Sequence, residues 1–227
     1  MNSALYLPRR LSSSDRAYTE EALLAASNYV VVLAEPGAGK TELMDSFARH
    51  LGVSSVTANV FKHIGASAGN CALVIDAFDE LAKIDDSGIY NLLANAKKAN
   101  PTHLIISSRS SEWDNAATNA FKDFLGVAPL IARLSEFDEA EQRTIFNHHV
   151  QGEDFAAFRM EVARFDLEAL LPNPQFLKLL ADAYIQSGRH FADKRSIFSQ
   201  AVERLAKEAN TSVTRTASPL STKKKLI

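Results

Sequence analysis

The segment VVVLAEPGAGKT at residues 30–41 constrains this chain most strongly. Its β-branched and apolar start predicts a buried strand, and a glycine-bearing turn, Lys40 and Thr41 follow. An apolar face at helical spacing continues over residues 40–51. In such a strand–turn–helix unit, successive backbone N–H groups point inward and bind phosphate oxygens. We therefore expect a phosphate-binding loop here, against the alternative of an ordinary turn with a surface lysine.

The residue types of this turn suggest individual roles. Lys40 supplies a point charge for the β- and γ-phosphates of a nucleotide, and the Thr41 hydroxyl is suited to ligate Mg²⁺. The Walker A pattern calls for glycine at the position of Ala34, which tolerates alanine if its φ stays negative. The residues expected to contact nucleotide are Glu35, Pro36, Gly37, Ala38, Gly39, Lys40, Thr41 and Glu42.

A second motif, which carries acidic residues, follows the phosphate-binding loop by one βα unit. CALVID at residues 71–76 is a short apolar run that ends in Asp76, which is typical of a strand buried on both faces of a parallel sheet. A carboxylate at this place holds Mg²⁺ in P-loop enzymes, so Asp76 is the expected metal carboxylate. Asp79 and Glu80 lie just beyond, where either is suited to orient a water and accept its proton. The alternative is an exposed acidic turn.

A third polar group follows the buried run HLIIS at residues 103–107. Ligands of open α/β sheets bind outside the carboxyl ends of the strands. Arg109 is therefore a candidate to stabilise phosphate charge, with Ser107 or Ser108 contributing a hydroxyl. The alternative is a solvated loop arginine.

The alternation of apolar runs and helical patterns predicts a three-layer α/β/α fold with a parallel five-stranded sheet. The expected strands are 29–34, 53–58, 71–76, 103–107 and 128–134. A helix is expected over 16–27 and a loop over 81–86. After Ser135 only helical patterns follow. We expect an N-terminal arm at 1–15, a nucleotide-binding core at 16–135, a helical lid subdomain at 136–210 and a disordered tail at 211–227.

Composition narrows the function classes. The formal net charge of −2 over 227 residues provides no general attraction to nucleic acid or anionic membrane. No run is long and apolar enough to span a bilayer, and the N-terminus lacks a hydrophobic signal core. The single cysteine, Cys71, abuts an apolar run and is expected to be buried. A cytoplasmic location is the expectation.

Four segments together carry a family resemblance. AEPGAGKT, LVIDAFDEL, LIISSRSSEW and NPQFLKLLA resemble the NACHT-type STAND NTPases, within the AAA-like group of ASCE P-loop proteins. The resemblance spans about residues 5–209. It implies that ATP or ADP with Mg²⁺ binds between the sheet and a helical lid, and that Arg109 is the sensor arginine. It further implies that Pro174 packs near adenine and that residues 6–11 pair with the adenine edge.

The leading hypothesis is an ATP-binding, Mg²⁺-dependent signalling switch that hydrolyses ATP slowly, of the innate-immune or antiviral type by resemblance. Such proteins self-associate and continue into winged-helix and sensor-repeat domains, for which this chain shows no pattern. One alternative is a non-hydrolysing ADP- or ATP-binding interaction module. Another is a P-loop kinase for a small molecule, which the paired acids at 79–80 disfavour.

Overall fold

The central element is a seven-stranded sheet in the order β2-β1-β7-β3-β6-β5-β4. The computed structural model describes residues 5–65, 71–85 and 87–199. Five neighbouring strands of the sheet run parallel and correspond to the five expected strands. Their bounds are β3 Tyr29–Leu33, β4 Ser55–Thr57, β5 Leu73–Asp76, β6 Leu104–Ser108 and β7 Leu130–Leu134.

The expected count of five strands is wrong, because two short antiparallel strands extend the sheet. These are β1, Leu11–Ser13, which pairs with β7, and β2, Arg16–Tyr18, which pairs with β1. The helix expected over residues 16–27 is correspondingly shorter, since α1 covers Glu20–Ala26 and the Thr19 side chain caps it. Strands of three residues rich in serine and arginine carry no apolar alternation, so periodicity does not reveal them.

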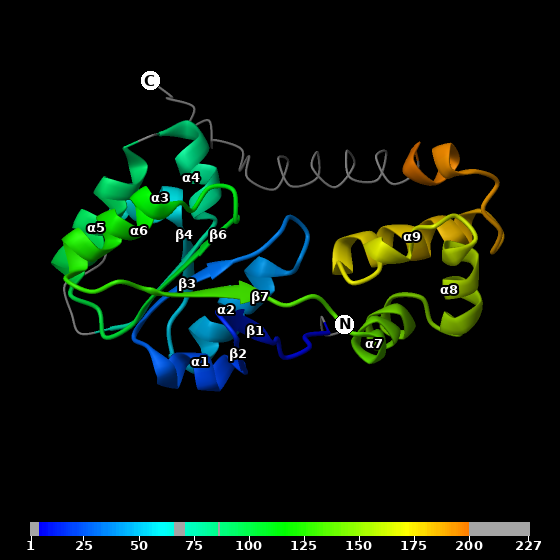
Figure 1. Cartoon of the computed structure of the whole chain (residues 1–227), viewed down its shortest axis with the longest axis horizontal. Helices are drawn as coiled ribbons and strands as arrows, with labels where there is room; N and C mark the ends of the chain where they lie inside the picture. The colour runs from blue at the N-terminus through cyan, green and yellow to red at the C-terminus, as the bar shows by residue number, and fades with distance from the viewer. Residues whose placement is uncertain (1–4, 66–70, 86, 200–227) are drawn as a thin grey trace, which may run out of the picture. The chain divides into compact units, whose positions relative to one another are not determined.

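Two hydrophobic cores lie on opposite faces of the sheet, and strand alternation produces them. Val30 and Val32 pack on one face with residues of α1 and α2, Lys40–His50. Val31 and Leu33 pack on the other face with α3–α6. Figure 1 shows α1 and α2 on one side of the parallel strands and α3–α6 on the other side. The strands β3, β5 and β6 contribute buried residues to both cores and are thus covered on both faces, as their apolar runs require.

The helices of the second face are α3 Ala58–Ile64, α4 Phe78–Ile84, α5 Gly88–Ala99 and α6 Asn115–Leu125. The loop expected over residues 81–86 is wrong, because α4 occupies most of that stretch. Phe78 and Leu81 lie one helical turn apart and are both buried, which anchors α4 on the core. Cys71 is exposed rather than buried, because it precedes β5 at the amino edge of the sheet.

By contacts, the chain divides into two compact units. The first runs to Glu141 and includes Asn173–Gln175, and the second comprises Gln142–Pro172 and the described residues from Phe176 onward. The remaining helices are α7 Glu139–His149, α8 Phe155–Ala163, η1 Glu168–Leu170 and α9 Pro174–Gln186. Residues 200–227, which include the end of the expected lid subdomain and the expected tail, lie outside the described residues.

An aromatic cluster forms the core of the second unit. Phe146 and Phe158 stack with centroids 4.6 Å apart, and both are fully buried. The ring centroids of Phe155 and Tyr184 lie 6.2 and 5.4 Å from the ring centroid of Phe158. These rings come from α7, α8 and α9, so the cluster ties three helices together.

Over the described residues, the helices are all too short or too polar to cross a membrane.

Candidate functional site

The loop between β3 and α2 has the backbone of a phosphate-binding turn. Gly37 and Gly39 adopt φ values of +75° and +88°, which side chains disfavour. Ala38 donates its N–H to the Glu35 carbonyl at 3.2 Å, and this bond closes the turn. Among the described residues, nothing accepts a hydrogen bond from the backbone N–H of Gly37 or Gly39. The loop therefore offers free N–H donors directly before the N-terminus of α2.

Ala34 stands where the Walker A pattern has glycine, and the structure shows why alanine fits. Ala34 is not one of the described non-glycine residues that have a positive φ. The residue is buried and donates its N–H to the Ser108 carbonyl at 3.1 Å. It thereby continues the β3–β6 ladder by one residue, a conformation that alanine adopts without strain.

The expected metal ligands lie in contact. The Thr41 hydroxyl donates to Asp76 Oδ2 at 2.8 Å, and Asp76 is 6% exposed. Ser107, fully buried in β6, donates its hydroxyl to Asp76 Oδ1. The Ala77 N–H donates to the same Asp76 oxygen at 2.8 Å and to the Ser107 hydroxyl at 3.0 Å. The Asp76 carboxylate is thus held at both oxygens.

Ala77 stores backbone strain beside this carboxylate. Its φ of +59° is left-handed, which costs a residue with a Cβ about 1 kcal/mol. The two hydrogen bonds of its N–H offset that cost. The turn at Ala77 starts α4 directly after β5, so Asp79 follows within one helical turn of Asp76. Strain of this kind concentrates at functional sites.

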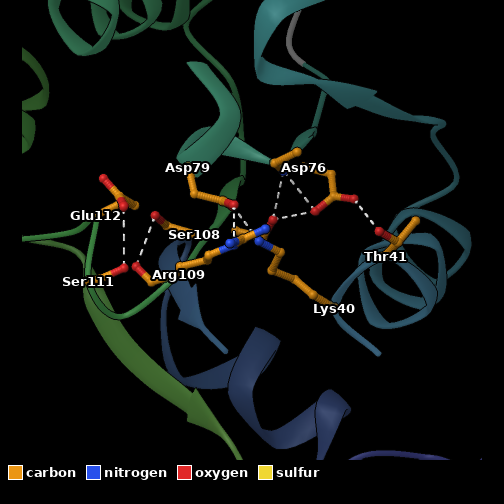
Figure 2. A network of polar contacts seen from close by, with 10 residues as sticks. Lys40, Thr41, Asp76, Asp79, Ser108, Arg109, Ser111 and Glu112 are labelled. Carbon is orange, nitrogen blue, oxygen red and sulfur yellow. Dashed lines mark hydrogen bonds and ion pairs between the residues drawn. The ribbon is translucent and has the colours of Figure 1, made fainter. Parts of the chain in front are cut away.

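Asp79 binds two cations from two different elements. One of its oxygens pairs with Lys40 Nζ, and Oδ2 pairs with Arg109 Nε at 2.7 Å. Its side chain is 2% exposed, whereas those of Lys40 and Arg109 are 15% and 36% exposed. Figure 2 shows the Lys40 and Arg109 side chains converging on Asp79, with Thr41 and Asp76 beside them.

The sheet order explains this convergence. β6 lies between β3 and β5, and all three are parallel. Leu33 is opposite Ser108, and Ile75 is opposite Ile106, so the three strands end at one edge. The loop before α2 follows β3, Asp76 is the last residue of β5, and Arg109 follows β6 directly. Three segments far apart in sequence therefore meet at the carboxyl edge, where α/β sheets bind ligands.

The other predicted residues are more peripheral. Glu80 is exposed, and its carboxylate pairs with no group in the described part of the chain. Glu35, Pro36 and Glu42 are exposed as well. Pro174 is the first residue of α9, and within the first unit its neighbour Asn173 donates Nδ2–H to the Pro36 carbonyl at 2.9 Å. The nucleotide contacts expected of these residues stay predictions.

The sequence predicts for Arg9 only the adenine-edge pairing of the whole 6–11 arm, with no role for its side chain, and for Ser107 only a hydroxyl contact. Arg9 donates Nη1–H to the Ala38 carbonyl, 2.7 Å away in the phosphate loop. Nothing in the local sequence distinguishes it from Arg10. Ser107 was detectable as a polar residue at the end of a buried run, one residue after Ile106, which pairs with Ile75. Ser108 Oγ turns instead to the carbonyl of Arg109 at 3.2 Å.

The site offers oxygen ligands that suit Mg²⁺ and N–H donors that suit the phosphates of a nucleotide. Hard oxygen ligands suit Mg²⁺, and a hydroxyl and a carboxylate lie within hydrogen-bond distance at Thr41 and Asp76. The free N–H groups of Gly37 and Gly39, with Lys40, form a cationic and donor-rich surface that suits phosphate. Asp79, by contrast, currently binds both cations of the site.

Comparisons with known proteins give no family. No protein-family model matches the chain, and no curated protein matches it. Among solved structures, the chain is similar to a closed-state cryo-EM reconstruction of Hsp104 with ATPγS and FITC-casein. That similarity has 16% identity and a TM-score of 0.43, and it covers 77% of this chain and 39% of the other. This chain therefore spans less than half of that protein, and a likeness at this level assigns no activity.

Proposed function

We propose that this chain is a P-loop nucleotide-binding domain that hydrolyses ATP slowly with Mg²⁺. One observation carries the proposal. At the carboxyl ends of β3, β5 and β6, ion pairs join Lys40, Asp79 and Arg109, and a hydrogen bond joins Thr41 to Asp76. Each element contributes a different chemical function to one edge of the sheet. A purely structural ion-pair network does not need the glycine loop with free N–H donors beside it.

The roles follow from the residue chemistry. The loop N–H groups and Lys40 hold phosphate oxygens, and Thr41 with Asp76 holds Mg²⁺. Bound there, Mg²⁺ neutralises phosphate charge and stabilises the transferring phosphoryl group. Arg109 stands at the next strand end, where its guanidinium can stabilise developing charge. Ser107 and the Ala77 N–H fix the orientation of Asp76.

Glu80 is the better candidate for the group that activates water. A general base must be accessible and free to accept a proton. Asp79 is buried and engaged by a cation at each oxygen, whereas Glu80 is exposed on the same turn of α4. Asp79 is then the group that pairs with Lys40 and Arg109 until phosphate binds to them. The sequence leaves the choice between the two acids open, and the burial and pairing of Asp79 support Glu80.

The finer function rests on the sequence resemblance alone. NACHT-type STAND NTPases use ATP and ADP states to switch a signalling protein between inactive and self-associated forms. The proposal extends to that role here, including defence signalling, a lid formed by the helical second unit, and Pro174 beside adenine. Further domains of such a switch would be its partners.

A phosphate-release assay on the purified chain tests the hydrolysis claim. Wild type should release phosphate from Mg·ATP, and Lys40→Ala and Glu80→Gln should both abolish release. Glu80→Gln should retain ATP binding, because Glu80 holds neither phosphate nor metal in this assignment. Glu139→Gln, an exposed acid at the start of α7, serves as the matched control. Release by wild type no faster than by Lys40→Ala would overturn the enzyme assignment.

A non-hydrolysing ATP- or ADP-binding module is the second candidate. The observation that favours it is the double engagement of Asp79, which leaves Glu80 as the unengaged member of the acid pair that follows β5. Under this alternative, nucleotide binds with the same dependence on Lys40 and Thr41. Wild type and Glu80→Gln then release phosphate at the same background rate.

A further inference from the structure

Arg9 lies buried against the phosphate loop, although it comes from the N-terminal arm. Its residue is 5% exposed, and its guanidinium stacks over the Phe137 ring at 3.7 Å from the centroid. Nη1 donates to the Ala38 carbonyl at 2.7 Å, and Nη2 donates to the Ser135 carbonyl at 2.7 Å. Burial lowers the pKa of Arg9, because desolvation disfavours the charged form. A buried charge is costly unless it is hydrogen-bonded, and both of these bonds of Arg9 go to main-chain carbonyls.

The hydrogen bond to Ala38 has a consequence for the next residue. The Ala38 carbonyl and the Gly39 N–H belong to one planar trans peptide, so they point in opposite directions. A guanidinium that holds the carbonyl on one side therefore aims the Gly39 N–H at the other side. Within the described chain that N–H has no acceptor. It is one of the donors that a phosphate would use.

This peptide needs an anchor because glycine flanks it. Gly37 and Gly39 both adopt left-handed backbone angles, and glycine has the widest conformational freedom in the unfolded and mobile chain. Gly39 is the N-cap residue of α2, and a glycine has no side chain with which to cap the helix. A Cβ at Gly39 would lie 3.0 Å from Arg9 Nη1, so the guanidinium also fills the space that a side chain there would need.

The arm itself is fixed by a buried carboxylate. Glu20, on α1, is 2% exposed and accepts hydrogen bonds from the Arg9 N–H at 2.6 Å and the Tyr6 hydroxyl at 2.5 Å. Ser46, on α2, donates its hydroxyl to the other Glu20 oxygen at 2.6 Å. Glu20 thus ties the backbone of Arg9 to the helix that follows the phosphate loop. The backbone of Arg9 is therefore fixed by Glu20, and its guanidinium is fixed by the Ala38 and Ser135 carbonyls.

From this geometry we infer that Arg9 is a positioning residue for phosphate. It orients the Ala38–Gly39 peptide so that the Gly39 N–H donates to a bound phosphate group. The inference rests on the proposed nucleotide site, and it assigns a task to the arm that differs from contact with the base. Arg9 acts through the peptide and does not itself contact phosphate.

Selective isotope labelling tests this inference directly. The chain contains two Ala–Gly pairs, Ala38–Gly39 and Ala68–Gly69, so ¹³C′-alanine and ¹⁵N-glycine labels yield two carbonyl–amide NMR signals. Ala68→Ser removes one signal and identifies the other. In Arg9→Met, the Ala38 carbonyl resonance should move upfield because it loses a charge-assisted hydrogen bond. In wild type, the Gly39 amide should shift on addition of Mg·ADP, and this shift should shrink in Arg9→Met.

Affinity provides the second readout. Arg9→Met should weaken ADP binding about tenfold, which corresponds to about 1.4 kcal/mol. Arg9→Lys, which keeps the charge but cannot donate to both carbonyls, should show the same carbonyl shift and protects the test against a folding failure of Arg9→Met. Arg10→Met is the matched control, because Arg10 is half exposed and pairs with Asp138 and Glu141. Its Ala38 signal and ADP affinity should match those of wild type.

The outcomes separate the two claims. An Ala38 carbonyl resonance that is unchanged in both Arg9 variants overturns the inference. An equal Gly39 response to ADP in wild type and in the variants overturns it as well. If the Gly39 amide of wild type does not respond to Mg·ADP at all, the proposed nucleotide site itself fails, even when the carbonyl shift shows that the Arg9 bond exists.

Discussion

Replacing Asp79 by asparagine is the sharpest perturbation that the ion-pair geometry offers. Asparagine keeps the shape of the side chain and removes its charge. The carboxamide oxygen can accept from Lys40 or from Arg109, but its NH₂ group then faces the other cation. The substitution therefore breaks a buried pair while leaving two like charges close together.

The expected loss of stability follows from burial. Removing one partner of a buried ion pair costs about 3–5 kcal/mol when the remaining charge stays buried. Lys40 and Arg109 are 15% and 36% exposed, so solvent can screen both cations. We discount the cost to about 2 kcal/mol, which corresponds to a fall in Tm of about 4–8 °C for a chain of this size. Circular dichroism melting without nucleotide measures it.

The same variant should bind nucleotide more tightly. In wild type, Asp79 competes with phosphate for Lys40 and Arg109, and its removal also takes a negative charge away from a polyanion site. We expect the Kd for ADP to fall about tenfold by calorimetry, or about 1.4 kcal/mol. Asp123→Asn, the same change on the exposed surface of α6, should leave both quantities unchanged. Weaker ADP binding in Asp79→Asn would refute the idea that this carboxylate competes with phosphate.

Three further predictions concern other parts of the molecule. Thr41→Val should reduce the ratio of ATP affinities with and without Mg²⁺ to about one, because it removes the expected metal ligand; a ratio kept at the wild-type value in calorimetry contradicts the metal assignment. The pKa of Asp85 is lowered from 3.8 to about 2, first by its hydrogen bond from Lys62 and then by Ser87. Because the folded pKa is depressed, this contribution to stability is present above pH 3.8 and is lost as the pH falls toward 2. The difference in urea midpoint between wild type and Lys62→Met should therefore shrink over that window, and a constant difference rejects the pairing. Phe158→Ala should lower the free energy of unfolding by about 3–5 kcal/mol, since the ring is fully buried among aromatic partners; a loss below about 1 kcal/mol in chemical denaturation is incompatible with that packing.

The parallel part of the fold was predictable because buried strands are nearly continuous apolar runs. CALVID and HLIIS coincide with β5 and β6 for this reason. The antiparallel strands β1 and β2 were not predictable, because pairing of three-residue strands depends on the neighbouring edge of β7 and not on a local pattern. The helix α4 was missed because the acids at its start favour a loop by composition.

The candidate site was likewise predictable only in part. Topology alone brings four of the predicted residues to one edge, because each lies at the end of a buried strand or shortly after it: Lys40, Thr41, Asp76 and Arg109. The ion pairs of Asp79 depend on the left-handed turn at Ala77, and the sequence does not specify that conformation. Arg9 approaches the loop from a distant segment through the Glu20 cluster. Contacts of that range arise from packing, which no spacing rule describes.

The equilibrium binding of ATP to wild type and to Lys40→Ala, each with Mg²⁺ and with EDTA, tests the central claim most directly. Isothermal titration calorimetry measures all four constants on the intact chain. The nucleotide-site account predicts saturable binding by wild type that weakens at least about tenfold when Mg²⁺ is removed, and a loss of binding in Lys40→Ala. Equal affinity of wild type and Lys40→Ala for ATP, or no binding by either, would contradict it.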